Sequence, residues 1–538
     1  MDASRLLTLP EELIAVIADH ISVESLLDFA LASPETYRHT KHRLEKNQRY
    51  HGELRIQHDH LPLQAPKLLR TALSDSEAIW HVRAFESWGA RPGFQKWKTW
   101  RFYEDITEEE QEEWLGPPED HTSLDADFYE PEELVHYRMI MMDVLHMSPS
   151  NVYKWIERIR DGWDEPIKGL LFALAPRLDR LNFIAYDSWQ STEYQGEDPL
   201  GFLCLAIRSV YDSLSIGAAW PPGFMSLRMV SICNSTSLRH PHDSYTTKPS
   251  RLAPLFLLPN IKVLNLTLLG YQDDEEPDFF LPPNSSTVEE LSFSCCSITL
   301  QAFIKFIQGC RHLRHFLCAA SSMGSNHRND TELFRTLSRC HNSTLESLSL
   351  DSYNRRLSIL ATSFPRLKVL DRLSIRDLVR DQIRNTEGLT FRPSDKPQTR
   401  AAVSADPVDG VDVVELRDAL PSSLEKLGLS THTVSANRPD FMARNAVLRA
   451  VADLVEDERF SNLKQICLRG LLNIASDDEE WDPHALKRIN QCGIDTHLQH
   501  SDFSPFWLAT RRHKRQHRDG NLGLVVNETD PRELRELQ

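Results

Sequence analysis

A short unit of apolar positions, written apolar-x-x-apolar-x-apolar, recurs along the carboxy-terminal two thirds of the chain. Its last three positions alternate, which places two apolar side chains on the same face of an extended strand. Apolar residues at helical spacing, such as Phe303, Ile304 and Ile307, separate some of these units. Repetition of strand, helix and parallel strand predicts an α/β solenoid with a parallel inner sheet. The units are Leu178–Phe183, Leu227–Ile232, Ile261–Leu266, Val288–Phe293, Leu313–Cys318, Leu345–Leu350, Leu370–Ile375, Leu424–Leu429 and Leu463–Leu468.

The spacing of these units resembles that of leucine-rich repeats. Several neighbouring units lie in or near the ~20–29 residues typical of such repeats, and the longer gaps leave room for insertions. Three similar phrases, beginning at Pro176, Pro259 and Pro365, predict recurrent turns into a strand. The Asn expected shortly after each strand is mostly missing, so the repeat is irregular. The alternative is an ordinary α/β domain with unrelated strands.

The first fifty residues follow a helical pattern instead. Leu9-Pro10-Glu11-Glu12-Leu13-Ile14 is a strong helix start, with Pro10 at the first helical position and two Glu near the positive end of the helix dipole. Ser22 is expected to cap a second helix, and Ser33-Pro34 to begin a third. Three helices of this length do not bury all their apolar surface among themselves, so a partner is expected to cover part of it.

The run from Leu6 to Leu44 resembles the F-box. It has the opening Leu-Pro-x-Glu-Leu, apolar positions one turn apart, a central Leu26-Leu27 pair and a third helix, but lacks the Val-Cys pair and Trp of many members. The resemblance implies docking onto the adaptor subunit of SCF-type (cullin–RING) ubiquitin ligases. The resemblance implies that the adaptor contact is made by Leu9, Pro10, Leu13, Ile14 and Ile17. It also implies that Leu26, Leu27 and Leu31 support this contact.

The remaining sequence suggests four regions: an F-box over 1–48, a helical connector over 49–165, the solenoid over 166–500 and a tail over 501–538. The connector holds seven of the eleven Trp, which we expect to fill irregular joints. Its stretch 104–133 is acidic without Lys or Arg and is expected to be a solvated loop, with a site for a basic partner as the alternative. The segment 391–412, with three Pro among charged residues, is expected to be an insertion between repeats.

Composition narrows the function classes. The net charge of −17 argues against a nucleic-acid binder, because phosphate contacts need a basic surface. No signal peptide or membrane-spanning stretch is visible, and the nine Cys lie mostly in apolar runs without a CxxC pair. We therefore expect a reducing compartment, cytoplasmic or nuclear. The basic run 511–518 is a nuclear-import signal, an anion-binding patch or a solvated tail.

Known catalytic and metal-binding motifs are missing from the sequence. There is no Walker loop, GxGxxG, GxSxG or HExxH, and the pairs His58/His60 and His240/His242 do not complete a metal-ligand spacing. We expect no cofactor, no metal and no enzymatic activity.

The prediction is therefore a substrate-recruiting adaptor, in which the amino-terminal helices hold a ligase and the sheet face holds a protein substrate. The alternative is a stand-alone leucine-rich-repeat scaffold that works outside any ligase. Strand alternation assigns the substrate surface to the positions between the inward apolar residues: Arg180, Asn182, Asn265, Glu290, Ser292, His315, Ser347, Ser349, Asp351, Lys426 and Gln465.

Overall fold

The computed structural model forms two compact units, which are described separately. The first holds residues 1–288, 309–311 and 513–538, and the second holds 289–308 and 312–512. The described residues are 9–59, 63–87, 91, 93–94, 128–185, 200–234, 249–267, 279–294, 296, 298–319, 330–350, 363–374, 416–430, 448–469 and 483–499.

The three predicted amino-terminal helices are present as α2 (Glu11–His20), α3 (Val23–Leu31) and α4 (Pro34–Leu54). Pro10 stands at the N-cap of α2, one position before its predicted place. Ser33 caps α4 as predicted: its hydroxyl accepts from the Thr36 amide at 3.1 Å, while the Thr36 hydroxyl accepts from the Ser33 amide at 2.9 Å. Helix α4 continues six residues past the boundary predicted at residue 48.

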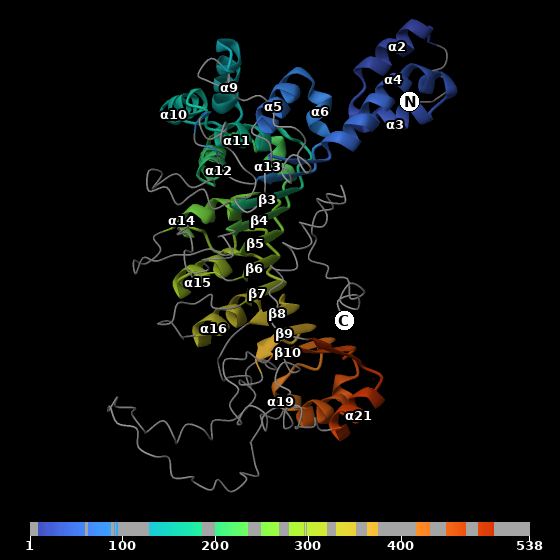
Figure 1. Ribbon diagram of the computed structural model, residues 1–538, viewed down its shortest axis with the longest axis vertical. Helices are drawn as coiled ribbons and strands as arrows, with labels where there is room; N and C mark the ends of the chain where they lie inside the picture. The colour runs from blue at the N-terminus through green and yellow to red at the C-terminus, as the bar shows by residue number, and fades with distance from the viewer. Residues whose placement is uncertain are drawn as a thin grey trace, which may run out of the picture. The chain divides into compact units, whose positions relative to one another are not determined.

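The described residues of the first unit form five strands that pair in parallel in chain order. In Figure 1, helices α12 and α14 lie along one side of β3, β4 and β5. The strands are β1 (Ile56–His58), β2 (Ala84–Ser87), β3 (Arg180–Ala185), β4 (Met229–Asn234) and β5 (Val263–Thr267). The other elements are α5 (Gln64–Ser74), α6 (Ser76–Trp80), α9 (Pro131–Asp143), α10 (Pro149–Arg160), α11 (Glu165–Leu174), α12 (Gly201–Ser213), η4 (Leu214–Ile216), α13 (Pro222–Ser226), α14 (Pro249–Leu252) and η5 (Ala253–Leu257).

The parallel pairing begins earlier in the chain than predicted. Strands β1 and β2 lie inside the region expected to be a helical connector, and β2 pairs with β3 from Ala84↔Arg180 onward. The apolar pattern gave no sign of them, because β1 is only three residues long with a single apolar side chain, and β2 buries the polar residues Glu86 and Ser87. The predicted helical connector over 49–165 therefore also contains two strands.

The second unit contains seven strands, again parallel and in chain order. Helices α15 and α16 lie beside β6–β8 (Figure 1). The strands are β6 (Glu290–Ser294), β7 (His315–Ala319), β8 (Ser347–Leu350), β9 (Val369–Ser374), β10 (Lys426–Ser430), β11 (Gln465–Arg469) and β12 (Asp495–Gln499). The other elements are α15 (Leu300–Gly309), α16 (Asp330–His341), α19 (Leu416–Ala419), η8 (Glu458–Phe460) and α21 (Pro483–Gln491). Residues 448–455 are also helical, as predicted.

The predicted units fall on β3–β11, so the mixed α/β class with parallel strands is confirmed. The unit placed at Leu370–Ile375 is wrong in register by three residues. Leu367 and Leu370 are the buried side chains there, and Leu370 pairs with Leu348 of β8 and Leu427 of β10. Leu370 therefore occupies the fourth position of the unit, not the first.

Aromatic side chains from helices and strands fill the core of each unit. In the second unit, the Phe293 ring lies 4.6 Å from Phe303 of α15 and 6.3 Å from Phe316 of β7, between ring centroids. In the first unit, Trp155 of α10 and Trp163 after it are buried, as expected for tryptophans that fill joints between elements. The insertion 391–412 and the tail from 501 lie outside the described residues, as does most of the acidic stretch 104–133.

Candidate functional site

The amino-terminal helices have a small core of their own. Ile14 and Ala18 of α2 are at most 4% exposed, and Leu26 and Ala30 of α3 at most 3%. Thr36 of α4 is also buried, and its hydroxyl is used by the cap at Ser33. The bundle is therefore packed inside without using all of its apolar side chains.

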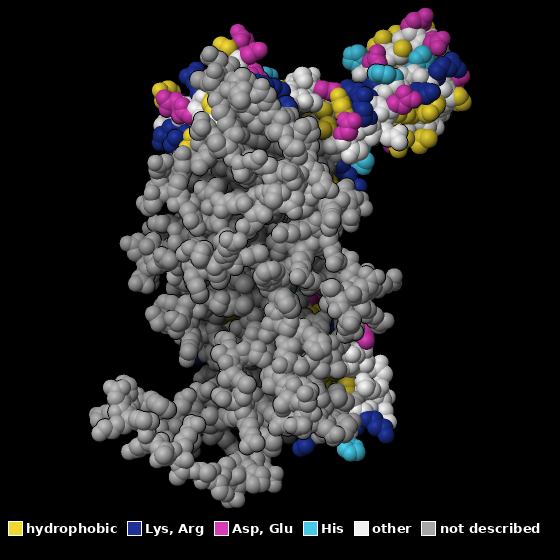
Figure 2. Space-filling view, in the orientation of Figure 1, with side chains coloured by type: hydrophobic (Ala, Val, Ile, Leu, Met, Phe, Trp, Pro, Cys, Tyr) yellow, Lys and Arg dark blue, Asp and Glu magenta, His cyan; other side chains and the backbone are white. Residues whose placement is uncertain are grey.

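The unused apolar side chains lie on the surface of these helices. Their exposed fractions are 49% for Leu13, 53% for Val16, 57% for Leu27, 75% for Leu31 and 50% for Tyr37. We call these five residues the apolar helix surface. Figure 2 shows hydrophobic side chains among the charged ones on this part of the chain. Exposed apolar area of this kind is typical of a protein-interaction site.

The predicted adaptor-contact residues divide between surface and core. Pro10 is exposed, and Leu9 and Ile17 are half-buried. Ile14 and Leu26 are interior residues, so for Ile14 the expected surface contact is corrected to a packing role, and Leu26 supports the bundle from within. Val16 was missed, although its position three residues after Leu13 places it near the same face of α2.

A polar joint ties α4 to α6. The Lys46 ammonium lies 2.7 Å from Asp75 and 3.2 Å from Glu77, and the Tyr50 hydroxyl donates to Asp75 at 2.9 Å. Arg43 bonds both Glu77 and the Ile21 carbonyl at the end of α2. The hydrogen bond to Asp75 raises the pKa of Lys46. This joint leaves the apolar helix surface uncovered.

The predicted substrate surface follows two rows of the parallel strands. In the first unit, Asn182, Ser231 and Asn265 are register partners on β3, β4 and β5, and the Asn265 amide donates to the Ser231 hydroxyl at 3.3 Å. Arg180 stands two residues before Asn182 and is also half-exposed. The expected alternation therefore brings Arg180, Asn182 and Asn265 to one face.

In the second unit, one register row joins most of the remaining predicted residues. They are Glu290, His315, Ser347, Lys426 and Gln465, with Val369 between Ser347 and Lys426.

The next outward row of this unit starts with Ser292, which is half-buried. Ser349 continues the row but is only 4% exposed, so its assignment to an accessible surface is corrected. Its neighbour in the register is Asp371, whose side chain reaches over Gly428 of β10. Predicted residue Asp351 lies outside the described residues.

A further row, at the residue before each strand, was missed by the sequence analysis. In the second unit these residues are linked by backbone hydrogen bonds of 2.7–2.8 Å. The amide of each row member donates to the carbonyl oxygen of the row member at the preceding strand, as Arg314 does to Glu289. The charges alternate strictly along this strand-entry row. Its members are Glu289, Arg314, Glu346, Lys368, Glu425 and Lys464.

These opposite charges are paired in space. Arg314 lies 2.8 Å from Glu346 and 3.7 Å from Glu289, and Lys368 lies 3.1 Å from Glu346. Lys464 lies 2.9 Å from Glu425. Hydrogen bonds from Lys368 and then Arg314 lower the pKa of Glu346. The strand-entry row of the second unit is thus close to electrically neutral.

The corresponding row of the first unit is Arg55, Arg83, Asp179, Arg228 and Lys262, joined by the same backbone hydrogen bonds. Here three arginines and one lysine accompany one aspartate. The sequence shows a charged residue directly before these strands. That these residues are neighbours becomes clear only from the register of the paired strands.

A buried ion cluster lies elsewhere in the first unit, where it joins α11 to the residues after β1 and β2. The Lys168 ammonium lies 2.6 Å from Asp59 and 3.2 Å from Asp164, and the Arg91 guanidinium lies 2.8 Å from Asp164. All four side chains are almost completely buried. Burial, and then the charge of Asp164, raise the pKa of the neighbouring Glu165 well above its usual value. Paired, enclosed charges of this kind join elements and offer no access to a substrate.

No three His, Cys, Asp or Glu side chains in the described part of the chain are grouped so that they could hold a metal ion. Within that part, none of the helices combines the length and apolarity needed to cross a bilayer.

Comparison with known proteins gives no assignment. No protein-family model matches the sequence, and no curated protein matches it either.

Proposed function

We propose that this chain is a non-catalytic, substrate-recruiting adaptor subunit of an SCF-type ubiquitin ligase, working in the cytoplasm, the nucleus or both. Its amino-terminal helices bind the ligase adaptor subunit, and its parallel strand face binds a protein substrate. Catalysis belongs to other subunits, so this chain contributes proximity and orientation.

The observation that carries the proposal is the apolar helix surface. Leu13, Leu27 and Leu31 are half or more exposed on helices that already have a packed core. Burying such side chains contributes ~1.5–3 kcal/mol each, so a partner that covers them gains considerable binding energy. The F-box resemblance of the same helices names the adaptor subunit as that partner.

The strand face supports the second half of the proposal. Its register rows present amide, hydroxyl, imidazole, carboxylate and ammonium groups in fixed positions on a rigid sheet. Mixed polar groups on regular strands suit recognition of a protein surface.

Co-purification of the tagged full chain with the ligase adaptor and cullin tests the ligase role. The unaltered chain is expected to retain both, and a Leu13→Asp/Leu31→Asp variant to lose both. If the folded, unaltered chain retains neither the ligase adaptor nor cullin, the ligase role is contradicted and the stand-alone scaffold is favoured.

Proximity labelling in cells tests the strand face. A Ser347→Ala/Lys426→Ala/Gln465→Ala variant is expected to lose labelled proteins that the unaltered chain retains. The matched control is Arg335→Ala on α16, an exposed position away from the strands. Equal labelling by all three chains would remove these positions from the substrate site.

A further inference from the structure

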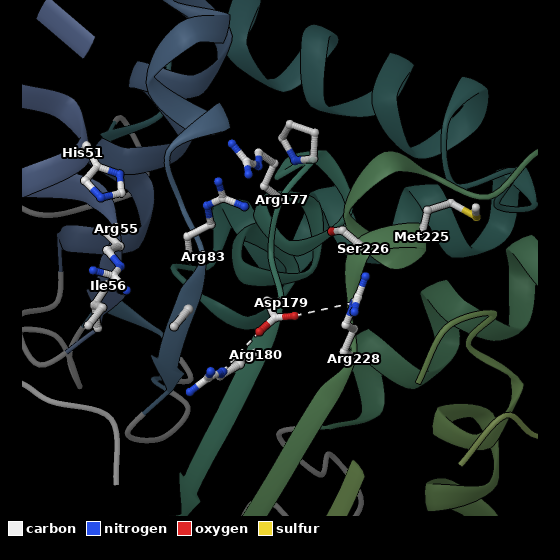
Figure 3. A pocket seen from close by; sticks show the side chains of 12 residues that line it. His51, Arg55, Ile56, Arg83, Arg177, Asp179, Arg180, Met225, Ser226 and Arg228 are labelled. Carbon is white, nitrogen blue, oxygen red and sulfur yellow. Dashed lines mark hydrogen bonds and ion pairs between the residues drawn. The ribbon is translucent and has the colours of Figure 1, made fainter. Parts of the chain in front are cut away.

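A basic pocket of about 650 Å³ lies at the amino-terminal ends of β1–β4 in the first unit (Figure 3). Five of its lining side chains are arginines from four successive strand entries and the turn before β3, and one is an aspartate. They are Arg55, Arg83, Arg177, Arg180, Arg228 and Asp179. This concentration of positive charge stands within a chain whose net charge is −17.

Asp179 balances only part of this charge. Its carboxylate lies 3.1 Å from the Arg180 guanidinium and 3.8 Å from that of Arg228, as the dashed lines of Figure 3 show. Arg55, Arg83 and Arg177 have no ion pair with any carboxylate among the described residues. The pocket therefore has an excess of guanidinium groups.

Trp80 holds two of these groups in place. The guanidinium carbon of Arg177 lies 4.1 Å from the centre of the Trp80 ring, and that of Arg83 lies 5.5 Å from it. Stacking on an aromatic face orients a guanidinium and leaves its N–H edge available to a ligand. Figure 3 shows Arg83 and Arg177 close together on one side of the pocket.

The second unit shows that the excess is not a general property of this backbone. At the equivalent strand-entry positions, Arg314 is held between Glu289 and Glu346, and Lys368 is bonded to Glu346. Like charges on adjacent strands are destabilising. Neighbouring guanidinium groups without a carboxylate partner, such as those of Arg55 and Arg83, are therefore unfavourable unless an anion occupies the pocket.

The chemistry of the pocket selects phosphate. Guanidinium groups bind phosphate oxygens in pairs of parallel hydrogen bonds, and a phosphomonoester carries close to two negative charges at neutral pH. Neighbouring strands are ~4.8 Å apart, so arginines spread over four strands cover more than one phosphate.

We propose that this pocket binds a ligand with clustered phosphate groups, supplied either by phosphorylated side chains of a protein or by a free polyphosphate. The inference goes beyond the adaptor role and does not depend on it.

Binding to the purified full chain tests the proposal, with three probes at low ionic strength. They are a short peptide with two neighbouring phosphoserines, the same peptide unphosphorylated, and inorganic tripolyphosphate. We expect the phosphopeptide, tripolyphosphate or both to bind, with an affinity that falls as salt is added, and the unphosphorylated peptide not to bind. Preference for the phosphopeptide identifies a protein source, and preference for tripolyphosphate a free one. Binding of neither would overturn the proposal.

Single substitutions locate the binding. Arg83→Gln and Arg177→Gln are each expected to weaken the affinity about tenfold or more, as loss of a charged hydrogen-bond donor does. Asp179→Asn is expected to tighten it several-fold, because it frees Arg180 and Arg228. The matched control, Arg314→Gln, removes the same charge at an equivalent strand entry and is expected to leave the affinity unchanged.

Two results would contradict the assignment. One is equal weakening by Arg314→Gln and Arg83→Gln, which would indicate a general charge effect. The other is weaker binding by Asp179→Asn. Asp179→Asn is predicted to bind more tightly, whereas a misfolded variant would bind more weakly. The predicted gain in affinity therefore cannot be an effect of misfolding.

Discussion

The amide of Arg83 donates a 2.9 Å hydrogen bond to the carbonyl oxygen of Arg55, so two arginines stand side by side at the start of neighbouring strands. In the second unit, every charged neighbour along the equivalent row has the opposite sign. The two rows share one backbone geometry and differ in charge balance. We infer that the paired charges of the second unit stabilise the sheet, whereas the excess positive charge of the first unit serves to bind a ligand.

Arg55→Glu is predicted to stabilise the protein, because it gives Arg83 a neighbour of opposite charge on each side along the row. Replacing a like-charge neighbour by an opposite one contributes ~0.2–1 kcal/mol. The gain should be measured by urea unfolding at low salt and should shrink at high salt. Arg314→Glu is the matched control and should destabilise, since it places a third glutamate between Glu289 and Glu346. A loss of stability on Arg55→Glu would contradict the comparison of the rows.

Gly428→Ala is predicted to destabilise the second unit by ~1–3 kcal/mol, as overpacking does. A Cβ at this position would lie 2.0 Å from Asp371 Oδ1 and 3.1 Å from the Asp371 Cα. Asp371→Ala should restore part of the lost free energy of unfolding when it is combined with Gly428→Ala. Strictly additive effects in this double-mutant cycle would show that the two residues do not share the space.

Arg43→Ala is predicted to cost ~1–3 kcal/mol, because it removes the donor from the carbonyls at the end of α2 and leaves the Glu77 carboxylate with Lys46 alone. Hydrogen exchange of the α2 amides should accelerate in this variant. Lys41→Ala is the control on the same helix: its ammonium lies 3.9 Å from Glu45 at an exposed position, and little change is expected. Equal exchange rates in both variants would show that Arg43 does not hold α2.

Much of the strand order follows from the apolar pattern, because alternation directly specifies one buried face. Strands β3–β8, β10 and β11 lie where that alternation predicts them. Strand β12 was missed because Asp495, Thr496 and Gln499 give no such pattern. The register of β9 was wrong because the spacing from Leu370 fits the unit, whereas pairing with Leu348 and Leu427 makes Leu370 its fourth position.

The candidate surfaces were less accessible to sequence reasoning. The same helical stripe holds Leu13, which is exposed, and Ile14, which is buried, and only packing between helices separates them. The strand-entry rows depend on register between residues far apart in the chain, such as Arg83 and Asp179. A single sequence carries no direct record of that register.

Glu165→Gln is predicted to stabilise the protein at neutral pH. Burial raises the folded-state pKa of this carboxyl well above that of the unfolded chain. The folded protein therefore holds a proton that the unfolded chain has lost, and stability falls as pH rises above the unfolded value of ~4.3. Glutamine carries no titrating proton, so the advantage of the variant should grow with pH and vanish in acid. A constant difference across this range would contradict the raised pKa.

The most direct test of the adaptor role is the dissociation constant between the purified full chain and the purified ligase adaptor subunit. Leu13→Asp/Leu31→Asp is predicted to weaken binding at least a hundredfold, because burying two charges in an apolar contact is unfavourable. Ile216→Asp, which alters an 85% exposed side chain away from these helices, is predicted to bind as the unaltered chain does. Tight binding that only the double variant loses is the result we predict. No binding by the folded, unaltered chain, or equal binding by all three, would contradict the central claim.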